Sequence, residues 1–247
     1  MPRGKRYIVS GHTYHITHRC HNRVFLLKFK KDRAAYRKMI WERLGKFDIS
    51  LFNYCITSNH THLLLRPNPS ATLESLSRFM QSLEGDFSQY FNRRKNRQNA
   101  FWGDRYHATM VESGRHLWKC LVYIDLNMVR AGVVGHPKDW EWTGYHELMG
   151  FRKRYRLIDM AKLLEQLEVG TEQSFRENYA FCIDEAIERE NMIRDAKWTE
   201  GLAVGTETFV KKLGGSIRNR MNVEIAEDEK NRSTWVVRES VRPHAYS

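Results

Sequence analysis

Residues 49–66 read ISLFNYCITSNHTHLLLR and contain two apolar stretches on either side of a short polar turn. The pair Ser58-Asn59 is typical of a tight turn, because asparagine tolerates the backbone angles that such turns need. We therefore predict a strand over residues 49–57 and a second, antiparallel strand over residues 60–66. This hairpin would be the central ribbon of a sheet.

The segments around this hairpin alternate between strand-like and helix-like patterns. Strands are expected over residues 14–17 and 108–111, and helices over residues 32–47, 72–91 and 115–131, the last closed by Gly132. The order is β-α-β-β-α-β followed by an added helix. This order predicts an α+β fold with the ferredoxin-like split βαββαβ antiparallel sheet and helices on one of its faces.

The chain is expected to have two regions, residues 1–150 and residues 151–247. Glycines and Pro137 after residue 132 mark the boundary, and the aromatic segment 140–145 is expected to pack back on the first region. The second region has a mostly helical, polar pattern, and we treat it as an accessory region without an assigned function. The last twenty residues are predicted to lack regular structure.

Basic residues outnumber acidic ones in this chain of 247 residues, which has 41 Lys and Arg against 29 Asp and Glu and a net charge of +12. Such a surplus favours a polyanionic partner, because each neutralised phosphate releases condensed counterions. No stretch is long and apolar enough for a signal peptide or a membrane-spanning helix, so no membrane partner is expected.

Four cysteines are far apart in the sequence and form no CxxC pair. This spacing excludes a zinc finger and a disulfide framework, and it is typical of proteins in a reducing compartment. We expect a cytoplasmic protein that associates with the nucleoid. The cysteines are Cys20, Cys55, Cys120 and Cys182.

Two histidines, His60 and His62, stand at the start of the second strand of the hairpin. Because side chains alternate along a strand, both imidazoles lie on the same sheet face, as two ligands of one metal ion require. Taken alone, such a pair is more often a polar strand face or two hydrogen-bonded histidines than a metal site.

Tyr123 and Asn127 are four residues apart in the predicted helix that follows the last strand. Residues at this spacing share one helix face. Taken alone, the pair fits a core tyrosine with a neighbouring amide. Together with His60 and His62, it supplies a metal site, an oxygen ligand and a nucleophile.

Five blocks of the sequence resemble the REP-associated tyrosine transposases, within the HUH superfamily of single-tyrosine transposases. The blocks are YHITHR at 14–19, NHTHLLL at 59–65, YFNRR at 90–94, FWGDRY at 101–106 and YIDLNMVRAG at 123–132. They stand in the order of the family within residues 7–150. Two positions depart from the family pattern: Thr61 in the middle of the histidine motif, which is expected to point away from the metal, and Met128 in place of a usual proline.

This resemblance implies that His60, His62 and Asn127 bind Mg²⁺ or Mn²⁺ and that Tyr123 is the nucleophile. It implies a metal-dependent single-stranded DNA endonuclease and strand transferase that acts on hairpin or palindromic repeat DNA through a 5′-phosphotyrosine, as a monomer or a homodimer. A divalent ion suits this chemistry, because a phenol with a pKa of about 10 attacks an anionic phosphodiester poorly. Two other functions stay open: a non-cleaving hairpin-binding relative, and a metallohydrolase that uses water.

Several basic residues are candidates for contacts with the DNA backbone. The run at 93–97 also fits a solvated helix end, where the helix dipole favours cations. The candidates are Arg19, Arg23, Arg93, Arg94, Lys95, Arg97 and Arg105.

Two further patterns are weighed against the main site. His12, His15 and His18 recur at a spacing of three, but His15 would face away from the other two on a strand, so phosphate-binding or structural roles are favoured. Tyr106 is a rival nucleophile, although it has no amide partner at helical spacing.

Overall fold

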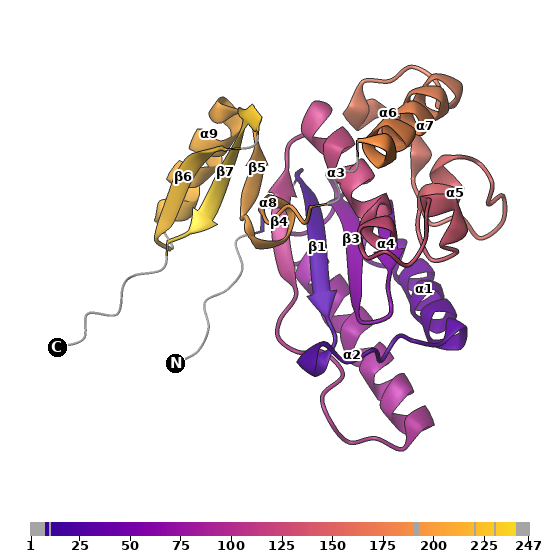
Figure 1. Ribbon diagram of the computed structural model, residues 1–247. Coiled ribbons are helices and arrows are strands. Elements are labelled where there is room, and N and C mark those ends of the chain that lie inside the picture. Colours follow the sequence, from indigo (N-terminus) through magenta and orange to yellow (C-terminus); the bar gives the residue numbers. More distant parts are fainter. Residues whose placement is uncertain (1–7, 10, 190–192, 220, 230, 241–247) are drawn as a thin grey trace.

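Seven strands form one mixed sheet in the computed structural model, which describes residues 8–9, 11–189, 193–219, 221–229 and 231–240 (Figure 1). Among the strands of these described ranges, only β4 and β5 are parallel neighbours. In spatial order the strands are β2 (Ile49–Ile56), β3 (His60–Pro67), β1 (Thr13–Arg19), β4 (His107–Val111), β5 (Ala203–Gly205), β7 (Asn231–Glu239) and β6 (Val223–Asp228).

The helices connect and cover these strands (Figure 1). In chain order they are α1 (Lys30–Leu44), α2 (Ser75–Lys95), α3 (Arg115–Asp125), α4 (Asn127–Arg130), α5 (Tyr145–Leu148), α6 (Met160–Leu167), α7 (Glu172–Glu188), α8 (Lys197–Glu200) and α9 (Glu207–Arg218). Two short 3-10 helices, η1 (His21–Arg23) and η2 (Pro137–Asp139), lie in loops.

The first four strands confirm the ferredoxin-like prediction. Their spatial order is β2-β3-β1-β4 and every neighbouring pair among them is antiparallel. The central β1 sets the register of the site, because Thr17 pairs with His62 on one side and with His107 on the other.

The two faces of this sheet carry different side chains, because side chains alternate along each strand. On one face Thr61 lies close to Tyr36 of α1, and the His18 ring stacks on Trp102. On the other face the His62 ring lies against Tyr123 of α3, with ring centroids 6.2 Å apart. The candidate histidine pair therefore faces α3, and Thr61 points away from it as predicted.

The helix predicted over residues 115–131 is divided at Leu126 into α3 and α4. At this residue ψ is 2°, outside the helical range, and Arg130 Nη2 donates to the Tyr123 carbonyl at 2.7 Å. In a continuous helix that carbonyl would accept from the Asn127 N–H. Gly132, with φ of +65°, ends α4 as predicted.

The accessory region contributes helices α6 to α9, as predicted, and also three strands that the sequence analysis did not include. β5 pairs with β4 in parallel, through Met110 with Ala203 and Val111 with Val204, so the sheet continues into this region. In Figure 1, β5, β6, β7 and α9 stand together beside β4.

The prediction that the last twenty residues lack regular structure was wrong for β7. This strand buries Val236 and Val237 and pairs with both β5 and β6, while α9 packs on it. β6 directly precedes β7 and forms a hairpin with it, whereas β5 comes from about 25 residues earlier in the chain. The pairing with β5 is a tertiary contact that the local sequence pattern does not reveal. Residues 241–247 lie outside the described residues.

The aromatic segment 140–145 packs back on the edge of the sheet, as predicted. Ile56 N donates to the Trp142 carbonyl at 2.9 Å, and Gly144 N donates to the Tyr54 carbonyl at 2.8 Å. Glycine is required at 144, because a Cβ there would overlap the Asn53 side-chain oxygen.

The four cysteines are free thiols, and three of them are buried. No helix in the described part of the chain is long and apolar enough to cross a lipid bilayer.

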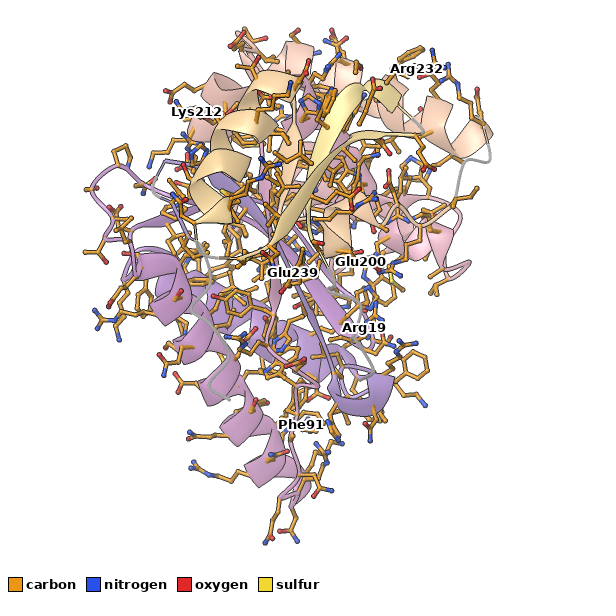
Figure 2. All side chains as sticks on the ribbon, turned by 90° about the vertical axis from the view of Figure 1, so that its left-hand side faces the viewer. Arg19, Phe91, Glu200, Lys212, Arg232 and Glu239 are labelled. Atoms are coloured by element: carbon orange, nitrogen blue, oxygen red, sulfur yellow. The ribbon has the colours of Figure 1, made fainter. Side chains whose placement is uncertain are left out.

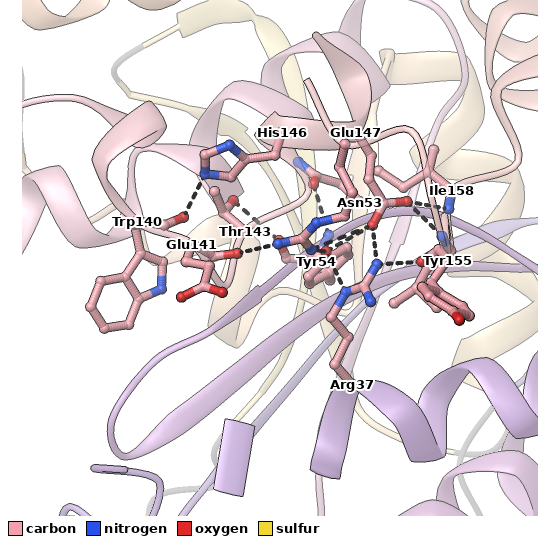
Figure 3. A network of polar contacts seen from close by, with 12 residues as sticks. Arg37, Asn53, Tyr54, Trp140, Glu141, Thr143, His146, Glu147, Tyr155 and Ile158 are labelled. Carbon is pink, nitrogen blue, oxygen red and sulfur yellow. Dashed lines mark hydrogen bonds and ion pairs between the residues drawn. The ribbon is translucent and has the colours of Figure 1, made fainter. Parts of the chain in front are cut away.

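A buried carboxylate, Glu147 of α5, ties α1, β2 and the chain after α5 together (Figure 3). Its Oε1 accepts from Arg37 Nη2 at 2.7 Å and from the Tyr54 hydroxyl at 2.8 Å. Its Oε2 accepts from the backbone N–H groups of Leu157 and Ile158, at 2.5 and 3.0 Å. Every oxygen of this buried group is therefore hydrogen-bonded.

Replacing Glu147 with alanine is expected to lower the free energy of unfolding by about 3–5 kcal/mol, because it leaves a largely buried guanidinium and two buried N–H groups without an acceptor. Urea denaturation measures this loss. The matched control is Glu185→Ala, which removes only an exposed i,i+4 pair with Arg189 and should cost less than about 1 kcal/mol. Equal losses in the two variants would contradict the assignment.

Candidate active site

The three predicted metal ligands lie together on the α3 face of the sheet. The His60 and His62 rings are T-shaped, with centroids 5.0 Å apart. Asn127 at the start of α4 has its Nδ2 2.9 Å from His62 Nε2, and its side chain opposes the lowering of the His60 pKa, so it lies near that ring as well. The amide therefore contacts one imidazole and lies close to the other.

The predicted nucleophile borders this group. The Tyr123 ring centroid is 6.2 Å from that of His62, and the tyrosine is only 8% exposed. The division at Leu126 keeps Tyr123 and Asn127 on successive helices while both side chains face the histidines. The four residues singled out from the sequence thus meet in one place.

A third histidine, His15 of β1, orients His62 through a hydrogen bond to its Nδ1. His15 is fully buried, and its Nδ1 lies 2.8 Å from the Trp198 carbonyl oxygen, which only accepts hydrogen bonds. The His15 Nδ1 therefore carries the proton. Burial lowers the pKa of His15 to about 3, so the ring is neutral near pH 7 and its Nε2 is an acceptor.

This acceptor determines the tautomer of His62. The His62 Nδ1 lies 2.8 Å from His15 Nε2, so it must donate its proton there. The His62 Nε2 then has a free lone pair, which accepts from Asn127 Nδ2. A chain of hydrogen bonds thus runs from the Trp198 carbonyl in α8 through His15 to His62.

His60 has the same tautomer as His62, but a different contact determines it. Its Nδ1 lies 2.7 Å from Asn59 Oδ1, so Nδ1 donates and Nε2 carries the lone pair. Burial and the positive charge of Arg19 lower the pKa of His60 to about 4. Burial likewise holds the pKa of His62 well below its ordinary value. Both imidazoles are neutral near pH 7, as metal ligation requires.

These residues fit a divalent metal ion. Two Nε2 lone pairs and an amide oxygen form a neutral donor set, once the Asn127 amide turns its oxygen inward. In the described ranges, no group of three or more His, Cys, Asp or Glu side chains is arranged to hold a metal. The candidate donors on this face are two imidazoles and one amide.

A cationic cavity of about 220 Å³ opens beside His60 and His62 and is also lined by Arg19, Arg105 and Arg194. Burial lowers the pKa of Arg19, with the charge of Arg194 as a second cause. The Glu200 carboxylate of α8 has the opposite effect on the pKa of Arg19 (both residues are labelled in Figure 2). Asp104 also lines the cavity and Arg194 pairs with Glu200, yet guanidiniums still outnumber carboxylates in the lining, which suits a phosphate.

Tyr123 is held as a neutral phenol with cations around it. Burial raises its pKa, whereas the charges of Arg130 and Arg194 lower it. The Arg130 guanidinium lies 4.1 Å from the centre of the ring. These two arginines would therefore stabilise the oxygen of Tyr123 as it gains negative charge.

The other predicted DNA contacts lie outside this cavity. Arg94 pairs with the fully buried Asp32 of α1, Lys95 lies 4.6 Å from the Phe29 ring centre, and Arg97 donates to Asn92 at 3.2 Å. Arg93 lines a separate surface pocket together with Arg94, and Arg23 is exposed in η1. Contacts of these five residues with DNA stay a prediction.

Two alternatives from the sequence lie on the opposite face. The His18 ring stacks on Trp102 and contacts the Glu84 carboxylate, so it has a structural role. Tyr106, the rival nucleophile, packs edge-on against His18, with ring centroids 6.4 Å apart.

Sequence reasoning missed three contributors to the site: Arg130, Arg194 and the carbonyl of Trp198. Arg130 had a signal, because it stands three residues after Asn127 and seven after Tyr123, at helical spacings. Arg194 and Trp198 come from the accessory region. No local pattern connects them to the hairpin.

Met128 does not disturb the site. It lies in the first turn of α4, where a proline is also tolerated because its missing N–H would have no helical partner. Its side chain is buried, and the preceding Asn127 keeps its contact with His62.

Residues 8–127 match the family model described as "Transposase IS200 like", which includes His60, His62, Tyr123 and Asn127. This segment is therefore similar to the IS200-like transposases. The IS200-like segment thus ends at the last predicted ligand.

A relative of this segment confirms the narrower resemblance. A Haemophilus influenzae protein named as a REP-associated tyrosine transposase is 29% identical over 121 residues. The match covers 46% of this chain and 66% of the relative, slightly under two thirds of its length.

One solved structure of a transposase shares the fold. A REP-associated tyrosine transposase bound to a REP hairpin superposes with a TM-score of 0.51 at 17% identity, over 61% of this chain and 86% of that one. A transposase from Deinococcus radiodurans gives a TM-score of 0.33 at 15% identity, over 44% of this chain and 84% of that one.

Proposed function

We propose that this chain is a metal-dependent endonuclease and strand transferase for single-stranded DNA, with Tyr123 as the nucleophile. One observation carries the proposal: the neutral imidazoles of His60 and His62 meet the Asn127 amide beside the Tyr123 ring. Residues 1–150 would form the catalytic domain. The accessory region 151–247 would support it through Trp198 and Arg194.

His60, His62 and Asn127 would hold Mg²⁺ or Mn²⁺. When bound, the ion supplies Lewis-acid stabilisation of the charge on the scissile phosphate. Mn²⁺ suits two nitrogen ligands better than Mg²⁺, which prefers oxygen.

The reaction exchanges one phosphoester bond for another. The Tyr123 oxygen bonds to phosphorus and loses its proton to solvent, while the 3′ oxygen of the neighbouring nucleotide leaves and takes up a proton. Arg130 and Arg194 favour the Tyr123 oxygen as it becomes negative, and Arg19 and Arg105 hold the phosphate. Because the 5′-phosphotyrosine conserves the bond, another 3′-hydroxyl can reverse the step and join a new strand without ATP.

Hairpin or palindromic repeat DNA is the proposed substrate. The related transposase of known structure was solved with a REP hairpin, and this chain carries a net charge of +12. A monomer or a homodimer fits this use.

Incubation with Mn²⁺ or Mg²⁺ and a labelled single strand that contains a hairpin tests the proposal. We expect a protein–DNA adduct that survives denaturing electrophoresis and is absent with EDTA. Cleavage without an adduct would indicate a metallohydrolase that uses water. Intact DNA with salt-sensitive binding would indicate a non-cleaving hairpin-binding protein.

Replacing His15 with leucine is expected to weaken Mn²⁺ binding about 10- to 100-fold, because His62 loses the acceptor that fixes its tautomer. Isothermal titration calorimetry without DNA measures this change. His15→Gln is the control, since its amide oxygen can accept from His62 Nδ1 and should restore most of the affinity. Equal Mn²⁺ affinity in His15→Leu and the unmodified protein would contradict this role.

A further inference from the structure

A second cavity, of about 970 Å³, lies beyond the β2 edge of the sheet, between α1 and the segment 141–155. It shares no lining residue with the cavity beside His60 and His62. Among its lining residues are Arg37, Trp41, Phe151, Lys153, Arg154 and Tyr155.

Three large rings of this cavity are exposed to solvent. Trp41 is 52% exposed, Phe151 62% and Tyr155 76%. Exposed aromatic side chains that gather in one concave site mark a binding surface, because each single ring would be more stable when covered.

The segment that carries two of these rings is held in place by the Glu147 network (Figure 3). Arg152 donates to the Tyr54 hydroxyl at 2.8 Å and to the Glu141 carbonyl at 3.0 Å. Arg37 donates to the Tyr155 carbonyl at 2.6 Å. The loop between these anchors is therefore pre-organised.

Tyr155 is held in a left-handed backbone conformation, with φ of +51°. This conformation is disfavoured for an aromatic residue and persists only where surrounding contacts impose it. Here the contact is the Arg37 hydrogen bond to its carbonyl, and the result is an exposed ring at the mouth of the cavity.

The cavity also has cations that are available to a ligand. Glu147 compensates Arg37 and lies near Arg152, and Glu141 pairs with Lys30. Lys153 and Arg154 are exposed and have no ion pair or hydrogen bond with any described residue. The unbalanced charge at the mouth is therefore positive.

We propose that this cavity binds unpaired nucleotides of a single strand, with bases stacked on Trp41, Phe151 and Tyr155 and phosphates held by Lys153 and Arg154. Flat apolar rings beside unpaired cations match the alternation of bases and phosphates. The proposal rests on the proposed function for the class of partner. The cavity would be a second, non-catalytic binding site for single-stranded DNA, outside the tyrosine site.

Fluorescence anisotropy with labelled oligothymidylate, in EDTA so that no cleavage occurs, tests the stacking part. The double variant Trp41→Ala/Tyr155→Ala is expected to bind at least about 5-fold more weakly than the unmodified protein. The control is Phe181→Ala on α7, which removes a ring that is 67% exposed elsewhere and should leave the affinity unchanged. Unchanged affinity in the double variant would overturn the proposal.

Salt dependence tests the phosphate part. Lys153→Ser/Arg154→Ser should reduce the slope of log Kd against log salt by about 1.4, the value for two phosphates on a single strand. Lys211→Ser/Lys212→Ser on α9 makes the same change of charge and should leave the slope as it is. Equal reductions in both variants would show that only net charge matters and would overturn the assignment.

The tests of this cavity and the test of the tyrosine site give independent results. The adduct assay reports Tyr123 chemistry with metal, whereas these binding assays contain none. If the unmodified protein forms the adduct while the cavity variants bind with unchanged affinity, only the proposal of a second site would be overturned. If the unmodified protein forms no adduct while the cavity variants bind more weakly, only the nuclease proposal would be overturned.

Discussion

Replacement of Tyr123 by phenylalanine is expected to abolish the covalent protein–DNA adduct, with a loss of cleavage rate of at least about 1,000-fold. The change removes one oxygen and keeps the ring, which contacts Arg130, His62 and Trp198. The fold and the metal ligands should therefore be retained. Affinity for the hairpin strand should stay within about 2-fold, because the phosphate contacts come from other residues.

Denaturing electrophoresis for the adduct and anisotropy for binding measure the two effects of Tyr123→Phe separately. The matched control is Tyr106→Phe, the same change at the rival tyrosine, which packs against His18 on the other face of the sheet. The control should cleave at the rate of the unmodified protein. Normal adduct formation by Tyr123→Phe would show that another group attacks the phosphate.

Replacement of His62 by alanine is expected to lower metal-dependent cleavage at least about 100-fold and to weaken Mn²⁺ binding at least as strongly as His15→Leu. The change removes one of two nitrogen ligands. It also leaves the buried His15 Nε2 and the Asn127 amide without the ring that joins them. EDTA should produce the same loss of cleavage in the unmodified protein.

Calorimetry with Mn²⁺ and a single-turnover cleavage assay measure both consequences of His62→Ala. His136→Ala is the control, because this histidine contacts Tyr145 and Asp184 and does not line the cavity beside His60. The control should match the unmodified protein in both assays. Full cleavage by His62→Ala at low Mn²⁺ would show that the metal binds at another site or that cleavage does not need a metal.

Much of this site was predictable because its signals are local. A strand alternates its side chains, so His60 and His62 had to share a face wherever the strand lay. A helix places residues four apart together, so Tyr123 and Asn127 had to be neighbours even though the helix divides between them. Both rules depend only on backbone geometry.

Other parts of the site depend on contacts between distant segments. Trp198 lies 183 residues from His15, and its carbonyl reaches the ring only because α8 packs on β1. Arg194 enters the cavity in the same way. The strand β5 joins the sheet at the edge of β4, and β7 joins it through β5, and neither of these long-range pairings is visible in a local pattern.

The sequence alone determined the βαββαβ order, the paired imidazoles and the tyrosine with its amide. These features follow from the periodicities of two and about 3.6 residues that the backbone imposes on strands and helices. Only the tertiary structure decided which nitrogen of each histidine is free, because a tautomer is determined by the partner of the other nitrogen. For His62 that partner is His15, which a carbonyl of the accessory region orients in turn.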